Sequence, residues 1–396
     1  MRGNGVTRGM GKNVFLLGIT SFLNDFSSEM IMPILPMFLL SLGGGGFVVG
    51  VVGGLRDSLS SLLKVIFGHI SDRTGRRKVY VTSGYITSSL FKLLLALSKA
   101  WQHVLLFTSL ERVGKGMRTA ARDAIIADSI PTERGRGFGI HRALDTSGAV
   151  AGSATVLLLL LYLNPPFRRI ILLAALLAFL SLLPLALVKE VRGRRGTEGF
   201  LMSLRALPSP LKRFIVASTI FSLANFSYMF FILKAHEAFP GELSVALPVL
   251  LYLLFNIFYA AFSLPFGRLS DRVGRRPVIA SGYLLFSLTS LGFTLARGAL
   301  LYGVLFALYG VVYAIVDGNQ RAYVSDLSPG ELRGTALGSY HTLAGLAALP
   351  GSIIAGLLWE INSSMTFLYG ALMASAASVV LLSLMGGKHK ERRPIQ

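Results

Sequence analysis

Long apolar runs, separated by short polar segments, follow one another along almost the whole chain. Each run is long enough to cross a lipid bilayer as a helix, which takes about 20 residues. Little sequence remains for a soluble domain, and 53% of all residues are hydrophobic. The pattern predicts an all-α polytopic membrane protein with twelve transmembrane helices. The predicted spans are 14–40, 47–70, 78–98, 101–127, 137–163, 168–188, 213–239, 244–270, 277–296, 299–325, 335–360 and 364–385.

A polar stretch of ten residues interrupts this pattern twice, at 68–77 and at 267–276. Seven of its positions are identical in the two copies, at a shift of 199 residues. A repeat at half the chain length indicates a duplicated helical bundle. The repeated residues include Gly68, Asp72, Arg73, Gly75, Arg76 and Arg77, and their counterparts Gly267, Asp271, Arg272, Gly274, Arg275 and Arg276.

Both copies resemble the cytoplasmic loop motif of the major facilitator superfamily, and the resemblance extends over the whole chain. It implies two six-helix bundles related by pseudo-symmetry, a central cavity between them, and transport by alternating access. The first bundle would span 1–188, a cytoplasmic linker 189–212, and the second bundle 213–396. The stretch IMPILPMFL in the first span is similar to tetracycline-type drug antiporters. The fifth span is similar to an antiporter motif in which a proline stands where this chain has Ser153.

The acids that end the fourth and tenth predicted spans, Asp128 and Asp326, also repeat, at a shift of 198 residues. Acids and arginines at helix ends can form charge-assisted pairs. We therefore expect two ionic clusters that hold one conformation closed. They would consist of Asp72, Arg76 and Asp128, and of Asp271, Arg275 and Asp326.

The net charge of +20 is distributed unevenly. Lysines and arginines concentrate in the loops after even-numbered spans, in both tails and in the central linker. The positive-inside rule therefore predicts cytoplasmic termini in a multi-pass protein of the cell membrane, with anionic lipid at its cytoplasmic rim. No basic domain stands apart from the spans, which argues against nucleic-acid binding. We expect a monomer with no cofactor or metal and no enzymatic activity, because no nucleotide motif, metal-ligand cluster or nucleophile triad is present.

Ionisable residues also fall inside the predicted spans. Asp25 and Glu29 are four residues apart in the first span, so they share a helix face. In the fourth span Glu111, Lys115 and two further arginines follow one narrow stripe. A charge at the bilayer centre costs about 2.5 to 3.5 kcal/mol, so these groups must pair or line a wet cavity.

Comparison of the two halves places most of these charges in the first half only. Asp25 aligns with Asn225, Glu29 with Met229, and Arg56 with Phe255. We expect charges of the first half to handle coupling, and the second half to supply mostly apolar contacts to substrate. The candidate cavity residues are Asp25, Glu29, Arg56, Asp57, Glu111, Arg112, Lys115, Asp145, Asn225, Asp317 and Arg321.

The leading hypothesis is proton-coupled efflux of a small organic, amphipathic compound. Two carboxylates one turn apart in a poorly hydrated site do not both ionise easily, so Asp25 and Glu29 would hold a proton and release it when substrate binds. Arg112 would be their counter-charge, with Lys115 in reserve. One alternative is an organic-anion uptake carrier, because eight bases outnumber six acids at membrane depth in the first half. A second is a non-transporting receptor or scaffold.

Overall fold

The computed structural model describes residues 11–129, 134–191, 207–329 and 332–384. These residues form helices and connecting turns, and no strand occurs among them. The helices are α1 (Lys12–Ile31), α2 (Leu35–Ser41), α3 (Gly46–Thr74), α4 (Arg77–Ala96), α5 (Trp101–Ser129), α6 (Arg134–Tyr162), α7 (Phe167–Leu180), α8 (Leu182–Ala186), α9 (Ser209–Ala224), α10 (Met229–Ala238), α11 (Leu243–Val273), α12 (Arg275–Leu295), α13 (Gly298–Asp326), α14 (Arg333–Ile361) and α15 (Ser363–Leu384).

Ten helices of the described residues are long and apolar enough to cross a membrane. The prediction of an all-α, polytopic membrane protein is therefore confirmed at this level. The predicted spans 14–40 and 101–127 are not among the ten. The first is divided into α1 and α2, and the second, α5, carries the densest set of charges in the chain.

Three predicted spans are interrupted. Pro33 lies between α1 and α2, and proline has no backbone N–H to continue the helical hydrogen bonds. Ser181 separates α7 from α8, and Pro184 is the third residue of α8. The break between α9 and α10 has no proline, and there the N–H of Ser227 donates to Ser352 Oγ of α14 at 3.1 Å. A side chain of another helix thus satisfies backbone that the break frees.

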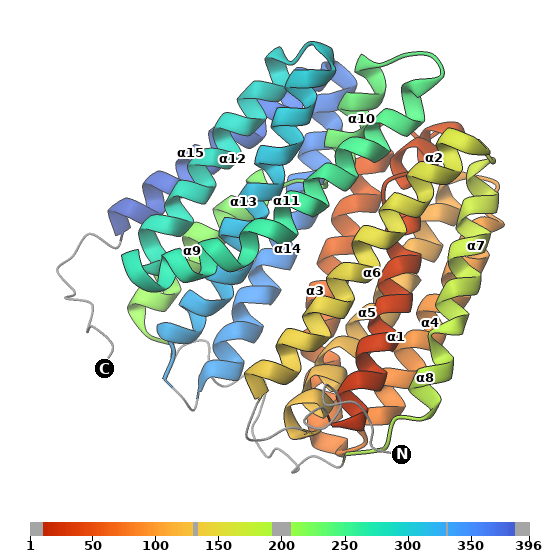
Figure 1. Cartoon of the computed structure of the whole chain (residues 1–396). Coiled ribbons are helices and arrows are strands. Elements are labelled where there is room, and N and C mark those ends of the chain that lie inside the picture. The colour runs from red at the N-terminus through yellow and green to blue at the C-terminus, as the bar shows by residue number, and fades with distance from the viewer. Residues whose placement is uncertain (1–10, 130–133, 192–206, 330–331, 385–396) are drawn as a thin grey trace.

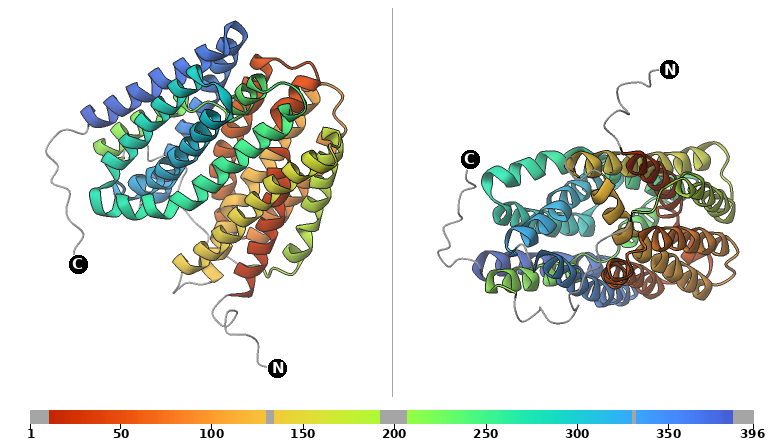
Figure 2. Two further views of the ribbon diagram at one scale, coloured as in Figure 1. Left: turned by 45° about the horizontal axis from the view of Figure 1, so that its top comes forward. Right: turned by 90° about the horizontal axis from the view of Figure 1, so that it is seen from below.

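The helix contacts repeat between the two parts of the chain. In the first part, α1 packs on α6 and α7, α4 on α5 and α7, and α3 on α5. In the second, α9 packs on α14 and α15, α12 on α13 and α15, and α11 on α13. Figure 1 shows these groups side by side, with red to yellow helices in one and green to blue helices in the other, and Figure 2 shows the same division from below. We call them the first group (α1–α8) and the second group (α9–α15).

Two pairs of helices, α3 with α14 and α6 with α11, make most of the contact between the groups. Glycines bring α3 and α14 together at the end remote from the repeated motif. A Cβ atom added to Gly50 would lie 2.3 Å from the carbonyl oxygen of Ser352, and one on Gly356 would lie 2.7 Å from that of Gly46. Only glycine fits such a backbone approach. Toward the motif, Gly267, Gly318 and Gly334 have no atom within 4 Å of an added Cβ.

Candidate functional site

The repeated motif forms an ionic cluster in each group. Arg275 lies 2.6 Å from Asp271 and 3.1 Å from Asp326. In the first group, Arg77 pairs with Asp128 and lies 3.6 Å from Asp72. Each cluster joins helices of its own group, so the proposed role in holding one conformation closed stays a prediction.

The expectation that Arg76 joins the first cluster is corrected. Arg76 is exposed and forms no ion pair with any described residue, and Arg77 takes its place. The cause is where the helices begin. α12 starts at Arg275, whereas Arg76 has φ −101° and ψ 74° and α4 starts one residue later, at Arg77. Arg73 and Arg272 are exposed, while Gly75 and Gly274 end their helices with positive φ angles of 69° and 99°.

Glu29 links the two groups of helices. Its Oε2 accepts a hydrogen bond from the hydroxyl of Tyr252 at 2.9 Å and one from Asn256 Nδ2 at 3.4 Å, both on α11. No lysine or arginine of the described residues lies within 4 Å of the Glu29 carboxylate. A deeply placed carboxylate is therefore held by neutral donors from the opposite group. The sequence comparison missed Tyr252 and Asn256 because they are neutral.

Asp25 of α1 and Asp145 of α6 lie close enough for their charges to interact. The glycine spacing on α6 explains this approach, since a Cβ atom on Gly148 or Gly152 would lie 2.3 Å from a backbone oxygen of α1. The structure thus brings Asp25 to a second acid, besides Glu29 on its own helix.

From Asp145 a chain of polar contacts crosses to the second group. Arg142 lies 3.2 Å from Asp145 and donates to the hydroxyl of Tyr259 on α11 at 3.2 Å. Tyr259 in turn donates to Asp317 of α13 at 2.8 Å, and Asp317 pairs with Arg321 at 2.5 Å. The predicted site residues Asp145, Asp317 and Arg321 thus belong to one network. Tyr259, which joins them, was not predicted.

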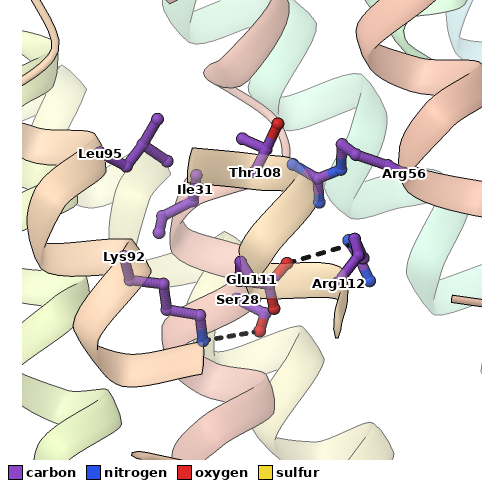
Figure 3. A pocket seen from close by; sticks show the side chains of 8 residues that line it. All are labelled: Ser28, Ile31, Arg56, Lys92, Leu95, Thr108, Glu111 and Arg112. Carbon is purple, nitrogen blue, oxygen red and sulfur yellow. Dashed lines mark hydrogen bonds and ion pairs between the residues drawn. The ribbon is translucent and has the colours of Figure 1, made fainter. Parts of the chain in front are cut away.

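A second buried cluster surrounds Met32, at the break between α1 and α2, and Figure 3 shows its two arginines, Arg56 and Arg112. The Nη2 atom of Arg56 lies 3.0 Å from the Met32 sulfur, and that of Arg112 lies 3.4 Å from it. Arg112 Nε is 3.2 Å from Glu111 Oε2 but is not aligned for a hydrogen bond. The structure therefore pairs Arg112 with Glu111, and not with Asp25 or Glu29 as the sequence suggested.

The remaining charged candidates occupy the same region. Lys115 makes no ion pair within 4 Å in the described part of the chain, so its role as reserve counter-charge of Asp25 and Glu29 stays a prediction. Asp57 is exposed, with no hydrogen bond or ion pair to a described residue. Lys92, whose importance the sequence did not reveal, is 2% exposed and donates to Ser27 Oγ and Ser28 Oγ of α1 at 3.0 and 2.9 Å.

The second group offers aromatic rings where the first has charges. Phe255, which aligns with Arg56, lies 4.9 Å from the ring of Tyr309 and 5.3 Å from that of Tyr313. Asn225, the counterpart of Asp25, exchanges hydrogen bonds only with the hydroxyl of Tyr313, at 3.3 and 3.4 Å. The ionic network is therefore unequal between the halves, as the internal comparison predicted.

A polytopic helical bundle whose buried charges lie between two repeated groups of helices is the architecture of a membrane transporter. Among the described residues, no group of His, Cys, Asp or Glu could hold a metal ion. The family model of the Major Facilitator Superfamily matches residues 17–253 and 241–396. The chain belongs to this superfamily, and it is a transporter and not an enzyme.

Two relatives and one solved structure show what this chain is similar to. An uncharacterized MFS-type transporter of Methanocaldococcus jannaschii is 52% identical over 379 residues, which cover 95% of either chain. The multidrug resistance protein MdtH of Cronobacter sakazakii is 29% identical over 148 residues, 37% of this chain and 36% of that protein. The crystal structure of the nucleoside transporter NupG superposes with a TM-score of 0.78 at 15% identity, over 94% of this chain and 98% of that one. The last likeness concerns the fold alone.

Proposed function

We propose that this transporter exports small organic compounds in exchange for protons. In this proposal twelve transmembrane helices form two six-helix halves, 1–188 and 213–396, with 189–212 as a cytoplasmic linker. Most of that linker lies outside the described residues. Both termini and both copies of the motif face the cytoplasm, with anionic lipid at that rim, and the transporter acts as a monomer.

The hydrogen bond between Glu29 and Tyr252 carries the proposal. It joins α1 of one group to α11 of the other, so its strength contributes to how firmly the two groups are held together. Hydrogen bonds to an ionised acceptor are roughly twice as strong as neutral ones. Protonation of Glu29 therefore weakens this link, and the charge state of one carboxylate is coupled to the relative position of the halves.

Asp25 and Asp145 supply the second part of the coupling. In this proposal the two acids share one proton, and Asp145 is linked through Arg142 and Tyr259 to the second group. A substrate that separates the two carboxyl groups would release that proton. The resemblance to a multidrug resistance protein over 37% of the chain favours export as the direction.

A second candidate, an organic-anion uptake carrier working as a symporter or uniporter, is favoured by Arg56. This arginine is 5% exposed and has no carboxylate within ion-pair distance in the described residues. The third reading, a non-transporting receptor or scaffold, would leave the shared-proton pair without a role.

Proteoliposomes that contain a pH-sensitive dye separate these candidates. Candidate compounds are added on the side of the motif loops, and proton movement is followed with and without an imposed pH gradient. Export by exchange predicts that substrate and protons move in opposite directions, and that Glu29→Gln abolishes the response. Movement in the same direction would indicate uptake by symport, and the absence of any flux would support the receptor reading.

A further inference from the structure

The cluster around Met32 contains more positive charge than it can neutralise. Arg56, Arg112 and Lys92 line a small cavity in which Glu111 is the one acid of the lining (Figure 3). Glu111 already lies 3.2 Å from Arg112. Asp57, beside Arg56 in sequence, is exposed and bonded to no described residue. A buried arginine normally has a carboxylate or phosphate partner. Among the described residues no carboxylate lies within 4 Å of Arg56, and the charges of Glu111 and Asp57 act on it only from farther away.

The acceptor that Arg56 does have is a weak one. A thioether sulfur accepts hydrogen bonds poorly, yet Arg56, Arg112 and the hydroxyl of Tyr228 all lie within 3.4 Å of the Met32 sulfur. Two guanidinium groups thus converge on a sulfur atom instead of an oxygen, beside the hydroxyl of Tyr228. Met32 lies just beyond the end of α1, and its unbranched side chain can take another position at low cost.

Aromatic rings of the second group lie beside this point. Tyr228, at the start of α10, donates to the carbonyl oxygen of Met32 at 3.0 Å. Its ring is 5.5 Å from that of Tyr252, which lies 5.7 Å from Phe255. Guanidinium groups from one half therefore meet flat apolar surfaces from the other half. A planar guanidinium binds a carboxylate through two parallel hydrogen bonds, and aromatic faces accommodate an apolar body.

We infer that Arg56 and Arg112 bind the carboxylate group of the transported compound, with its apolar or aromatic body against Tyr228 and Tyr252. The Met32 sulfur occupies the position of the carboxylate when the site is empty. Lys92 adds positive charge from the side of α4. This inference rests on the proposed transport function and assigns its substrate class, aromatic monocarboxylates. It is independent of whether protons drive the movement.

Binding to the purified, full-length protein in detergent tests the inference without any gradient. Benzoate is compared with benzamide, which has the same shape but no charge, and with acetate, which has no aromatic body. We expect benzoate to raise the melting temperature, acetate to raise it less, and benzamide to leave it unchanged, since a ligand stabilises the state that binds it. An equal response to benzoate and benzamide would overturn the assignment.

Substitutions locate the site. Arg56→Gln and Arg112→Gln should each weaken benzoate binding at least tenfold, whereas Arg168→Gln should not change it. Arg168 donates to the carbonyl oxygen of Ser98, away from the cavity. If the neutral variant does not fold, Arg56→Lys, which keeps the charge, takes its place. It should bind benzoate more weakly than the wild type because a lysine cannot donate two parallel hydrogen bonds to a carboxylate. Wild-type affinity in Arg56→Lys, or in Arg56→Gln if that variant folds, would overturn the inference.

A third variant tests the sulfur directly. Met32→Leu keeps the apolar volume and removes the acceptor, so benzoate affinity should stay equal or rise. A tenfold loss would contradict the role of the sulfur as a placeholder.

The inference and the proposed function can fail separately. Benzoate binding without proton movement in liposomes rejects proton exchange and keeps the site, whereas proton-driven flux of neutral compounds alone, without benzoate binding, rejects the site and keeps the exchange.

Discussion

Arg77 and Arg275 occupy the same structural position in the two repeats, although the sequence repeat places Arg76 opposite Arg275. Each is the first residue of its helix. Arg275 directly follows Gly274, which ends α11, whereas Arg76 stands between Gly75, which ends α3, and Arg77. From there Arg77 or Arg275 reaches an acid in the loop motif and an acid at the end of the neighbouring helix, Asp128 or Asp326. The start of the helix, and not the position in the motif, therefore decides which arginine pairs.

Arg77→Gln should change the balance between conformations, and Arg76→Gln should not. Asp72→Asn should act in the same direction as Arg77→Gln, with a smaller effect, because Asp72 is 56% exposed and such pairs contribute about 1 kcal/mol or less. The chain has no cysteine, so maleimide labelling of Ser61→Cys, beside Gly345 of α14, reports the separation of α3 and α14. Equal labelling rates in the Arg76 and Arg77 variants would contradict this assignment.

Tyr252→Phe should alter coupling because it removes the stronger of the two donors to Glu29. A hydrogen bond to a charged group contributes about 1.5 to 3 kcal/mol, so the rate of proton-driven exchange at a fixed pH should change about tenfold or more. Tyr302→Phe is the matched control, since its hydroxyl donates only to the carbonyl oxygen of Lys234. The pH profile of exchange in proteoliposomes decides the question, and identical profiles for both variants would exclude Glu29 as the coupling group.

Asp25→Asn should abolish proton-driven accumulation while substrate binding and downhill exchange persist. The reason is that an asparagine has nearly the same shape as Asp25 but no carboxyl group that could take up and release a proton. Asn225→Ala, at the repeat-related position, should cost less transport because Asn225 bonds only to Tyr313. Equal losses of transport in the two variants, at equal expression and melting temperature, would reject the unequal roles of the halves.

Gly50→Ala should weaken the closed contact between α3 and α14. The added methyl group would lie 2.3 Å from the carbonyl oxygen of Ser352, and backbone must move to accept it. Gly318→Ala is the control, since an added Cβ meets nothing within 4 Å there. Labelling of Ser61→Cys should rise several-fold in the first background and stay unchanged in the second.

The all-helical membrane fold could be predicted from sequence because hydrophobic runs of membrane length have few other solutions. The close approach of α1 and α6 was also predictable, since Gly148 and Gly152 recur at the helical period. The breaks at Pro33 and at Ser227 were not, because the apolar pattern continues through them. Helix interruptions depend on which neighbouring side chain satisfies the freed backbone, and that is a property of packing.

The charged residues of the site were found because a charge inside an apolar run is conspicuous. Their pairing was not found, since Arg112 lies beside Glu111 in its own span, and spacing alone does not choose between this acid and the acids of the first span. The neutral partners Tyr252, Asn256 and Tyr259 left no signal, because tyrosine and asparagine in a span are equally compatible with packing. They became visible only when α11 was placed against α1 and α6.

The contact of Gly50, Gly54 and Gly356 also bears on how the two halves can rotate. Backbone meets backbone at Gly50 and Gly356, so a rolling motion about these two points has few side-chain rotamers to rearrange there. The population of each position is then set mainly by the few polar links elsewhere. A change of about 1.4 kcal/mol in one such link would alter the ratio of inward-facing to outward-facing molecules tenfold.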